Sequence, residues 1–429
     1  MEAKQQEYGM ISAKMTVEFD GKSLTMQQAS LILKDTDREK RKKIYNLIQK
    51  RRLEDEEKLD NLYDELIILR QKIAKNAGYS NYRDYMFSAM GRFDYKPEDC
   101  FDFHNAISKN IVPIITSFEE KRKKKLNYVN YKPWDTAVDI DGLKPLNPFN
   151  GGNELTDLTI KCFSKLRPYF GDCISIMKEM KYLDLESKEG KAPGGFMYPL
   201  HEIGVPFIYM NSVGSQRDLV TMVHEGGHAI HSFLCRNLEL TEFKSTPSEV
   251  AELASMAMEL LSMDYWDTFY KDKKELKRAK LEQLEKALGT LPWVAAIDKF
   301  QHWIYTNKHT SKERKEKWLE IDAELGNQII NWEGQESAQK IMWQRQLHLY
   351  EVPFYYIEYG MAQLGAIAVW RSYKKQGDVA IENYINALKL GYTKSIGEIY
   401  KTAGIKFDFS EKYVKELASF VKEELKKLS

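Results

Sequence analysis

Residues 224–231 read His-Glu-Gly-Gly-His-Ala-Ile-His, and the rest of the sequence is best interpreted outward from this stretch. Its first five residues have the H-E-x-x-H pattern, in which two imidazoles four residues apart on a helix can bind one zinc ion. At about 100° of rotation per residue, His228 lies about 40° around a helix from His224, so both rings reach one point. Glu225 would lie beside that point, where a general base for a zinc-bound water belongs.

The residues before the motif predict that it lies inside a helix. Ser215 and Asp218 have the spacing of a capping box, and an apolar run over 219–223 follows them. Gly226 and Gly227 each cost a helix about 1 kcal/mol relative to alanine. Close packing behind the metal would compensate for this cost.

A second helix start downstream supplies the third ligand that a catalytic zinc needs. Thr246 is expected as the N-cap of this helix, Pro247 as its first residue and Glu249 as the capping partner. Glu252 then falls in the early turns of the helix. This position suits a ligand that is presented from a second element.

The two stretches together, His-Glu-Gly-Gly-His at 224–228 and Pro-Ser-Glu-Val-Ala-Glu at 247–252, resemble the M3 family of zinc metallopeptidases. The sequence is most similar to the oligoendopeptidase F and Pz-peptidase branch, with thimet oligopeptidase in the same group. This resemblance implies that His224, His228 and Glu252 bind the metal and that Glu225 is the base. It extends over nearly the whole chain.

Two further residues are expected close to the zinc site. Glu259 lies seven residues after Glu252, on the same helix face, and could accept the second N–H of a ligating imidazole. A solvated carboxylate is the alternative. His231 is expected as a hydrogen-bonded neighbour of the site and not as a ligand. His104, His201, His302 and His309 show no partner pattern, and no role is expected for them.

A third cluster spans 348–360 and contains one histidine and several tyrosines. Hydroxyl and imidazole donors stabilise the oxyanion that forms during peptide hydrolysis. M3 peptidases carry substrate-contacting His and Tyr residues in this region, which implies such a role for His348 and Tyr359. On a helix, Tyr355 or Tyr356 could share a face with Tyr359, and the sequence leaves open which of them does. Aromatic side chains are also common in buried helices.

The composition argues against several classes of partner. The net charge is +1, with 64 Lys and Arg against 63 Asp and Glu, so neither nucleic acid nor an anionic membrane is expected. The four cysteines show no CxxC pair, and no signal sequence is recognised, which favours a cytoplasmic protein. The apolar segment 352–370 contains Glu358 and Gln363, and is expected to be a buried helix.

The chain is predicted to be mainly α: a large helical zincin-type metallopeptidase with one small β-sheet next to the active-site helix. Long helical patterns include 37–77 and 97–126, the latter kinked at Pro113. Two further helices are expected at 274–288 and 292–306, separated before Pro292. Short strands are expected within 15–19 and around a Gly-rich turn between 182 and 211. We expect one catalytic domain over 1–429, in which 1–150 could form a helical subdomain and 151–429 the catalytic core.

The expected function is hydrolysis of internal bonds in short peptides, with one zinc ion per chain. Three alternatives stay open: a carboxypeptidase of a related zincin family, a peptide-binding protein that contains zinc but does not cleave, and a structural zinc site. Structural sites favour four ligands with cysteine, which this pattern lacks. Typical M3 members have further N-terminal helices that line a substrate channel. Self-association that replaces this wall, giving a homo-oligomer, is a hypothesis that a monomer in sedimentation would contradict.

Overall fold

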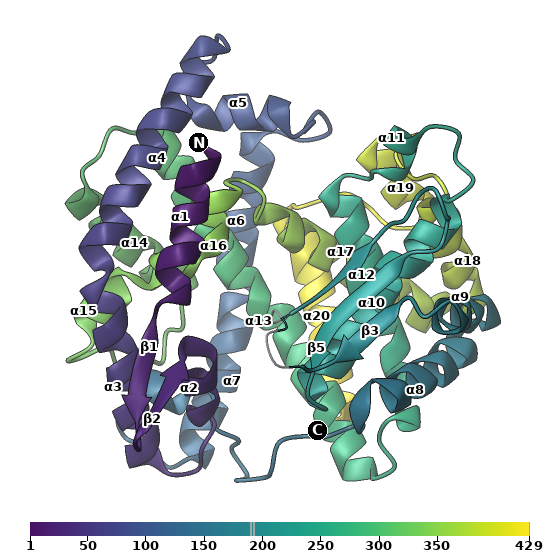
Figure 1. Ribbon diagram of the computed structural model, residues 1–429, viewed down its shortest axis with the longest axis horizontal. Helices are drawn as coiled ribbons and strands as arrows, with labels where there is room; N and C mark the ends of the chain where they lie inside the picture. Colours follow the sequence, from purple (N-terminus) through teal and green to yellow (C-terminus); the bar gives the residue numbers. More distant parts are fainter. Residues whose placement is uncertain (189–190, 192–193, 429) are drawn as a thin grey trace. The chain divides into compact units, whose positions relative to one another are not determined.

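The computed structural model describes residues 1–188, 191 and 194–428, and it is mainly helical, as predicted (Figure 1). The chain forms two compact units. One unit consists of Met1–Lys144 and Gly289–Ile357, and the other of Pro145–Leu288 and Glu358–Ser429. The chain thus leaves the first unit close to residue 150, but it returns there later, so the units are not two consecutive halves. The expected single catalytic domain stays a prediction.

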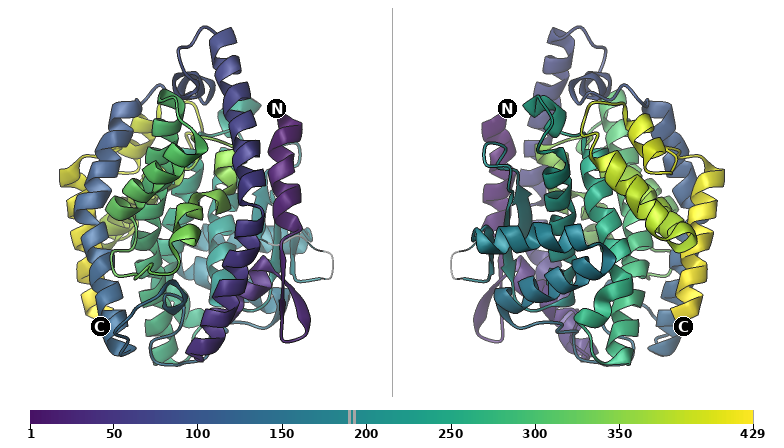
Figure 2. Two further views of the ribbon diagram at one scale, coloured as in Figure 1. Left: turned by 90° about the vertical axis from the view of Figure 1, so that its left-hand side faces the viewer. Right: turned by 90° about the vertical axis from the view of Figure 1, so that its right-hand side faces the viewer.

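The first unit consists of helices and one short hairpin. Its elements are α1 (Glu2–Ala13), β1 (Thr16–Phe19), β2 (Lys22–Thr25), α2 (Met26–Ile32), α3 (Arg38–Glu54), α4 (Glu56–Asn76), α5 (Tyr82–Ala89), α6 (Pro97–Asn110), α7 (Val112–Lys125), η1 (Pro133–Asp135), α14 (Ser311–Leu325), α15 (Glu336–Lys340), η3 (Met342–Arg345) and α16 (Leu347–Glu351). Figure 2 shows α1 alongside α4, with which it packs.

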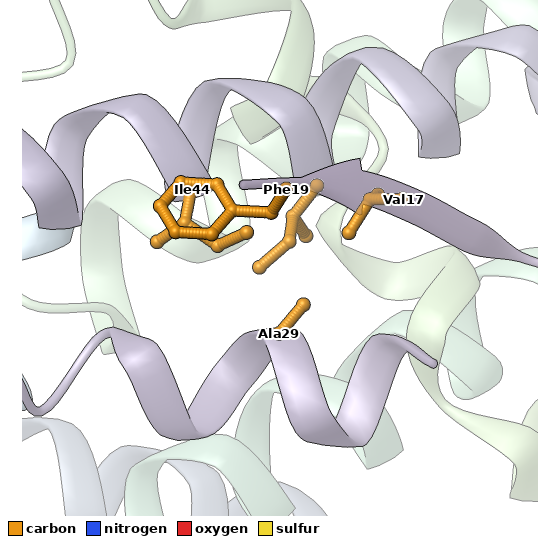
Figure 3. Close-up of a cluster of buried hydrophobic side chains, with 5 residues drawn as sticks. Val17, Phe19, Ala29 and Ile44 are labelled. Carbon is orange, nitrogen blue, oxygen red and sulfur yellow. The ribbon is translucent and has the colours of Figure 1, made fainter. Parts of the chain in front are cut away.

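The hairpin β1–β2 encloses part of the core of this unit. Asp20 and Gly21 have positive φ angles of 50° and 76°, which a tight turn of this kind requires. The alternation of the strand directs Val17 and Phe19 inward, onto Ala29 of α2 and the buried face of α3 (Figure 3). The predicted strand and turn are therefore present, whereas α1 was not predicted.

Two predicted long helices are interrupted. The pattern over 37–77 is divided at Asp55 into α3 and α4, and Asp55 leaves the helical region with φ −101° and ψ 4°. The predicted kink near Pro113 is a break at Ile111, since Pro113 lies in the first turn of α7. A proline is tolerated there because the first N–H groups of a helix have no acceptor within it.

The second unit contains the candidate zinc helix. Its elements are α8 (Gly151–Leu166), α9 (Pro168–Glu179), β3 (Leu183–Glu186), β4 (Gly195–Tyr198), β5 (Phe207–Ser212), α10 (Gln216–Cys235), α11 (Thr241–Lys244), α12 (Ser248–Ser262), η2 (Met263–Thr268), α17 (Ile357–Gln376), α18 (Asp378–Leu388), α19 (Ile396–Thr402) and α20 (Glu411–Leu428). The helices α8 and α9 pack against each other (Figure 2), and α10 packs against α12 (Figure 1).

The small sheet of this unit has the strand order β3-β5-β4. β3 is parallel to β5, and β4 is antiparallel to it, so β4 forms an edge of the sheet. Both β4 and β5 contact α10. The small sheet predicted next to the active-site helix is present. Within the predicted Gly-rich turn, Gly190, Ala192 and Pro193 lie outside the described residues.

One helix, α13 (Lys273–Thr306), runs from the second unit into the first. The sequence predicted two helices here, separated before Pro292, but the helix continues through this proline. A proline in a helix costs about 3 kcal/mol, since it removes a hydrogen bond and clashes with the preceding turn. The flanking residues Leu291, Val294 and Ala295 are all fully buried, and their burial offsets this cost.

The apolar segment predicted to be a buried helix forms most of α17, which begins at Ile357. Among the described residues, no helix is both long enough and apolar enough to cross a bilayer.

Candidate metal centre and active site

The helix α10 begins as the sequence predicts. The Ser215 hydroxyl accepts a hydrogen bond from the Asp218 backbone N–H at 3.3 Å, and the Asp218 carboxylate accepts one from the Ser215 N–H at 2.9 Å. This capping box places the N-cap of the helix nine residues before His224. The H-E-x-x-H motif therefore lies in the middle of a helix with both imidazoles on one face.

Two glycines allow α10 to lie very close to its neighbours. A Cβ at Gly227 would lie 2.7 Å from both the Ala254 carbonyl oxygen and the Ser255 Cα of α12. A Cβ at Gly226 would lie 2.7 Å from the Phe163 ring of α8. Since real Cβ atoms do not approach backbone atoms this closely, the glycines are required for the contact, as the sequence suggested.

The helix α12 begins one position later than predicted. Pro247, not Thr246, occupies the N-cap position, and no side chain caps the helix. The expected capping role of Glu249 is therefore wrong; Glu249 is buried, and its carbonyl oxygen accepts a hydrogen bond from Tyr400 at 3.0 Å. Glu252 nevertheless lies in the second turn, where its side chain can face α10.

The structure brings together possible ligand atoms of His224, His228 and Glu252, all within 4.8 Å of one another. The Glu252 Oε2 lies 3.4 Å from His224 Nε2 and 3.8 Å from His228 Nε2. The two imidazole rings are nearly perpendicular, with centroids 4.9 Å apart. Two imidazole nitrogens and one carboxylate oxygen are a donor set that fits zinc with a fourth position open, so these residues could hold the metal.

Further hydrogen bonds orient these donors. The Glu259 Oε1 lies 2.7 Å from His224 Nδ1, which is the contact expected from the sequence, and it leaves His224 Nε2 facing Glu252. The Gln283 side chain donates to the other Glu259 oxygen at 2.6 Å. Ser255 donates to Glu252 Oε2 at 3.1 Å. The sequence did not point to Gln283 or Ser255, although Ser255 lies three residues after Glu252 and so on the same helix face.

The electrostatics of the cluster favour a positive charge between the carboxylates. Burial lowers the pKa of His228 to about 4, so this ring is neutral near pH 7. Burial also lowers the pKa of His224, but hydrogen bonds to Glu252 and Glu259 outweigh it and raise the pKa to about 10. The same two carboxylates that stabilise a proton on His224 would stabilise a metal cation.

Glu225 is buried beside this cluster, with 6% of its surface exposed. Burial raises the pKa of Glu225 to about 7, although the charge of His224 and a hydrogen bond from the Met197 backbone of β4 oppose the rise. A carboxyl group with a pKa near neutrality can both accept and release a proton during one reaction cycle. The arrangement therefore suits acid–base chemistry next to the metal donors.

His231 does not belong to the donor cluster. Its ring is buried and hydrogen-bonds the backbone of Leu388, where α18 ends, and burial lowers its pKa to about 3. The Cys235 thiol donates to the same Leu388 carbonyl oxygen at 3.1 Å. The His231 hydrogen bond thus connects α10 to the end of α18, so its role is structural.

His348 lies in the first unit, on α16, and has a defined hydrogen-bond partner. Its Nδ1 is 2.6 Å from the side-chain nitrogen of Gln346. The Gln346 oxygen accepts from the Trp293 indole N–H at 2.8 Å, and an indole can only donate. The Gln346 amide must therefore donate to Nδ1, so the neutral imidazole carries its proton on Nε2. Burial lowers the pKa of His348, which favours this neutral form.

The tyrosines of the third cluster are distributed differently from the prediction. Tyr355 and Tyr356 lie in the turn before α17, so the helix-face argument that paired either of them with Tyr359 is wrong. Both rings contact His348, with centroids 6.0 and 4.8 Å from its ring. Tyr359 lies in the first turn of α17, in the second unit.

Comparison with known proteins gives a consistent result. Residues 31–419 match the sequence model of peptidase family M3. The chain is 24% identical over 352 residues to the oligopeptidase PepF of Bacillus subtilis (strain 168), an alignment that covers 81% of this chain and 50% of that protein. It is 25% identical over 380 residues to an oligoendopeptidase F homolog of Borreliella burgdorferi, covering 86% of this chain and 62% of the relative.

Solved structures agree with the sequence comparison. A structure of Pz peptidase A with an inhibitor superposes on 99% of this chain and 75% of its own, with a TM-score of 0.91 and 28% identity. A putative oligoendopeptidase F has the same TM-score and coverage at 26% identity. The chain thus spans about half to three-fifths of the length of the two curated relatives. Because the family model matches most of its residues, the chain belongs to peptidase family M3.

Proposed function

We propose that the protein is a zinc-dependent endopeptidase that hydrolyses internal bonds of short peptides. The observation that carries this proposal is the cluster of His224, His228 and Glu252, whose ligand atoms lie within 4.8 Å of one another with Glu225 buried next to them. A zinc ion held by this donor set supplies a Lewis acid that polarises a scissile carbonyl and activates water.

The residues of the chain would divide the remaining chemistry among them. Glu225 would accept a proton from the attacking water and later deliver it to the leaving amine nitrogen. The buried environment that raises the pKa of Glu225 supports this double role. Glu259 and Gln283 would keep the His224 ring in the orientation that directs Nε2 toward Glu252.

The proposal assigns His348 the role of a hydrogen-bond donor to the developing oxyanion, with Tyr355, Tyr356 and Tyr359 as further donors. The family resemblance supports this assignment for all four residues. For His348 there is independent support, since the chain Trp293–Gln346–His348 leaves the proton of the neutral ring on Nε2.

The edge strand β4 is the proposed docking element for an extended peptide. An edge strand can bind a peptide through main-chain hydrogen bonds, which tolerates many side-chain sequences. Phe196 and Tyr198 on β4 are half exposed, so they could contact substrate side chains. We place the activity in the cytoplasm, on the support that none of the four cysteines forms a disulfide.

The test is incubation of the purified chain with a mixture of short peptides, before and after removal of its metal with a chelator. Mass spectrometry of the fragments should show cleavage at internal bonds, loss of cleavage after metal removal and recovery on addition of zinc. Stepwise loss of C-terminal residues would instead identify a carboxypeptidase. Binding of peptides without any cleavage would identify a peptide-binding protein.

A further inference from the structure

A second cluster of metal-binding residue types lies in the first unit, between α6 and α13. The possible ligand atoms of Cys100, Asp298 and His302 all lie within 4.8 Å of one another. Cys100 and Asp298 are fully buried, and His302 is 4% exposed. None of these residues belongs to the proposed catalytic metal cluster of His224, His228 and Glu252, which lies in the second unit.

The spacing of these residues along the two helices is that of metal ligands. Cys100 and His104 lie four residues apart on α6, and Asp298 and His302 lie four residues apart on α13. Residues four apart on a helix lie on one face, as His224 and His228 do on α10. Two such pairs on packed helices therefore direct four donor-bearing side chains toward each other.

The cluster leaves polar atoms without partners in the part of the chain that the structure describes. Neither ring nitrogen of His302 has a hydrogen-bond partner, and neither has Asp298 Oδ1. His302 Nε2 lies 3.2 Å from Asp298 Oδ2, but outside hydrogen-bond geometry. Buried polar groups are rarely left unsatisfied in proteins, so a ligand bound by Asp298 Oδ1 and one nitrogen of His302 would supply a missing partner.

Aromatic side chains surround the His302 imidazole. The rings of Phe87, Phe101 and Phe354 lie 5.0–6.0 Å from the imidazole, and they offer no hydrogen-bond acceptors. His104 differs from His302, since its Nε2 lies 2.8 Å from Asp298 Oδ2. His104 can thus orient the Asp298 carboxylate by donating to one oxygen while the other oxygen stays available.

We propose that Cys100, Asp298 and His302 form a second metal site, with His104 as the residue that positions the carboxylate. Thiolate, imidazole and carboxylate together match zinc better than the hard cations magnesium and calcium, which prefer oxygen. Bond lengths of about 2.0–2.3 Å place ligand atoms of a tetrahedral site about 3.3–3.8 Å apart, so the three side chains need to close in by at most about 1.5 Å.

A cavity borders the two histidines of this cluster. His104 and His302 line a cavity of about 260 Å³ whose rim includes Arg83, Lys299 and Lys317. Each of these three cations is already paired with a carboxylate, at 2.6–2.9 Å. The rim therefore does not present an uncompensated positive charge to an entering metal ion. The bound metal would connect α6 to α13.

The test uses cobalt, because a thiolate ligand gives Co²⁺ an intense near-ultraviolet charge-transfer absorption and the catalytic donor set contains no sulfur. The full chain is compared with a variant carrying both His224→Ala and His228→Ala, which removes the imidazoles of the catalytic cluster. We expect this variant to keep one metal ion per chain, by elemental analysis, and to show the thiolate absorption. Failure of the proposed peptidase function would leave both results unchanged.

Cys100→Ser should abolish the thiolate absorption, whereas Cys162→Ser, another fully buried thiol, should leave it intact. His104→Asn should keep the absorption but weaken metal binding about 10–100-fold, as loss of a positioning partner does. A wild-type chain that binds Co²⁺ without this absorption, or an absorption that persists in Cys100→Ser, would overturn the proposal. The readout on the wild-type protein does not depend on whether a variant folds.

Discussion

Glu259 determines how His224 can act, although it is not one of the proposed metal ligands. Its Oε1 lies 2.7 Å from His224 Nδ1 and accepts the proton of this nitrogen in a hydrogen bond, so Nε2 faces Glu252. Gln283 on α13 fixes the Glu259 carboxylate in turn, at 2.6 Å. The orientation of one imidazole on α10 therefore depends on hydrogen bonds that begin on two other helices.

Replacing Glu259 should weaken metal binding without removing a ligand. In Glu259→Leu the His224 ring loses its acceptor and can rotate, so we expect zinc affinity to fall about 10–100-fold. Competition with a chromophoric chelator measures this affinity directly. Gln283→Leu is the control, because the Gln283 side chain donates to Glu259 and not to His224, and its effect should be smaller. Equal zinc affinities for wild type and Glu259→Leu would show that this hydrogen bond does not orient the ring.

The hydrogen bonds that connect Trp293, Gln346 and His348 predict which tautomer the His348 imidazole adopts. The indole donates to Gln346 and the amide donates to His348 Nδ1, so nitrogen NMR shifts should identify His348 as the Nε2–H form. In Gln346→Leu this preference should disappear and kcat should fall, while zinc content stays unchanged. An Nδ1–H tautomer in the wild-type protein would contradict the assignment, as would a Gln346→Leu variant with full activity.

The contact between α10 and α12 depends on the absence of one methyl group. A Cβ at Gly227 would lie 2.7 Å from backbone atoms of α12, which cannot move aside as a side-chain tip can. Gly227→Ala should therefore push α12, and Glu252 with it, away from the two imidazoles. We expect a loss of about 1–3 kcal/mol of unfolding free energy, typical of overpacking, and weaker zinc binding. Urea unfolding and zinc titration measure the two effects.

Gly289→Ala is the matched control for this substitution. Gly289 also lies in a helix, α13, but a Cβ there would meet nothing within 4 Å. Its replacement should stabilise the protein by up to about 1 kcal/mol, since alanine has the higher helix propensity. If Gly227→Ala and Gly289→Ala changed the unfolding free energy similarly, helix propensity and not the close approach of α12 would explain the effect at Gly227.

The elements show where sequence patterns succeed and where they fail. The start of α10 depends on Ser215 and Asp218, which lie three residues apart, so it can be predicted from local chemistry. The first helix, α1, has no side-chain cap, and it is held partly by stacking of Tyr8 on the distant Tyr350, with ring centroids 4.2 Å apart. Such a contact exists only after folding, so the sequence pattern alone does not reveal α1.

The same reasoning explains the missed parts of the two sites. The spacing of His224 and His228 is visible in the sequence because both residues belong to one helix. Cys100 and His104 have the same spacing, as do Asp298 and His302, but only the packing of α6 against α13 shows that the pairs meet. Pro292 likewise predicted a break in α13, because the buried contacts that offset its cost are tertiary.

Stability of the whole molecule should depend on one buried ion cluster in the first unit. Asp135 is fully buried and accepts hydrogen bonds from Arg38 and Arg41, both within 3.0 Å. Burial by itself would raise the pKa of Asp135, but these hydrogen bonds, together with one from the Lys132 backbone, hold it below its usual value. Asp135→Asn leaves the buried Arg41 without its counter-charge and should cost about 3–5 kcal/mol at neutral pH.

The stability cost of Asp135→Asn should depend on pH, because the pKa of Asp135 is lowered in the folded protein. The pKa of an aspartate in the unfolded chain is about 3.9. When the pKa is lower in the folded protein, the carboxylate stabilises the fold at a pH above about 3.9, and this stabilisation is lost as the pH falls through the folded-state pKa. The difference in unfolding free energy between wild type and Asp135→Asn should therefore narrow in urea titrations below about pH 4. Asp141→Asn, at a half-exposed pair with Lys125, should cost less than about 1 kcal/mol. A difference in unfolding free energy between wild type and Asp135→Asn that stays constant from pH 7 to pH 3 would contradict this account.

The central claim is that Glu225 performs acid–base chemistry at a metal centre that it does not itself bind. The most direct measurement compares zinc content and peptide cleavage for wild type and Glu225→Gln, with Glu424→Gln as a control for neutralising another buried carboxylate. We predict that Glu225→Gln keeps its zinc and cleaves at least about 100-fold more slowly, as expected for loss of a general base, while the control is unaffected. Cleavage by Glu225→Gln at the wild-type rate, with zinc bound, would contradict the claim.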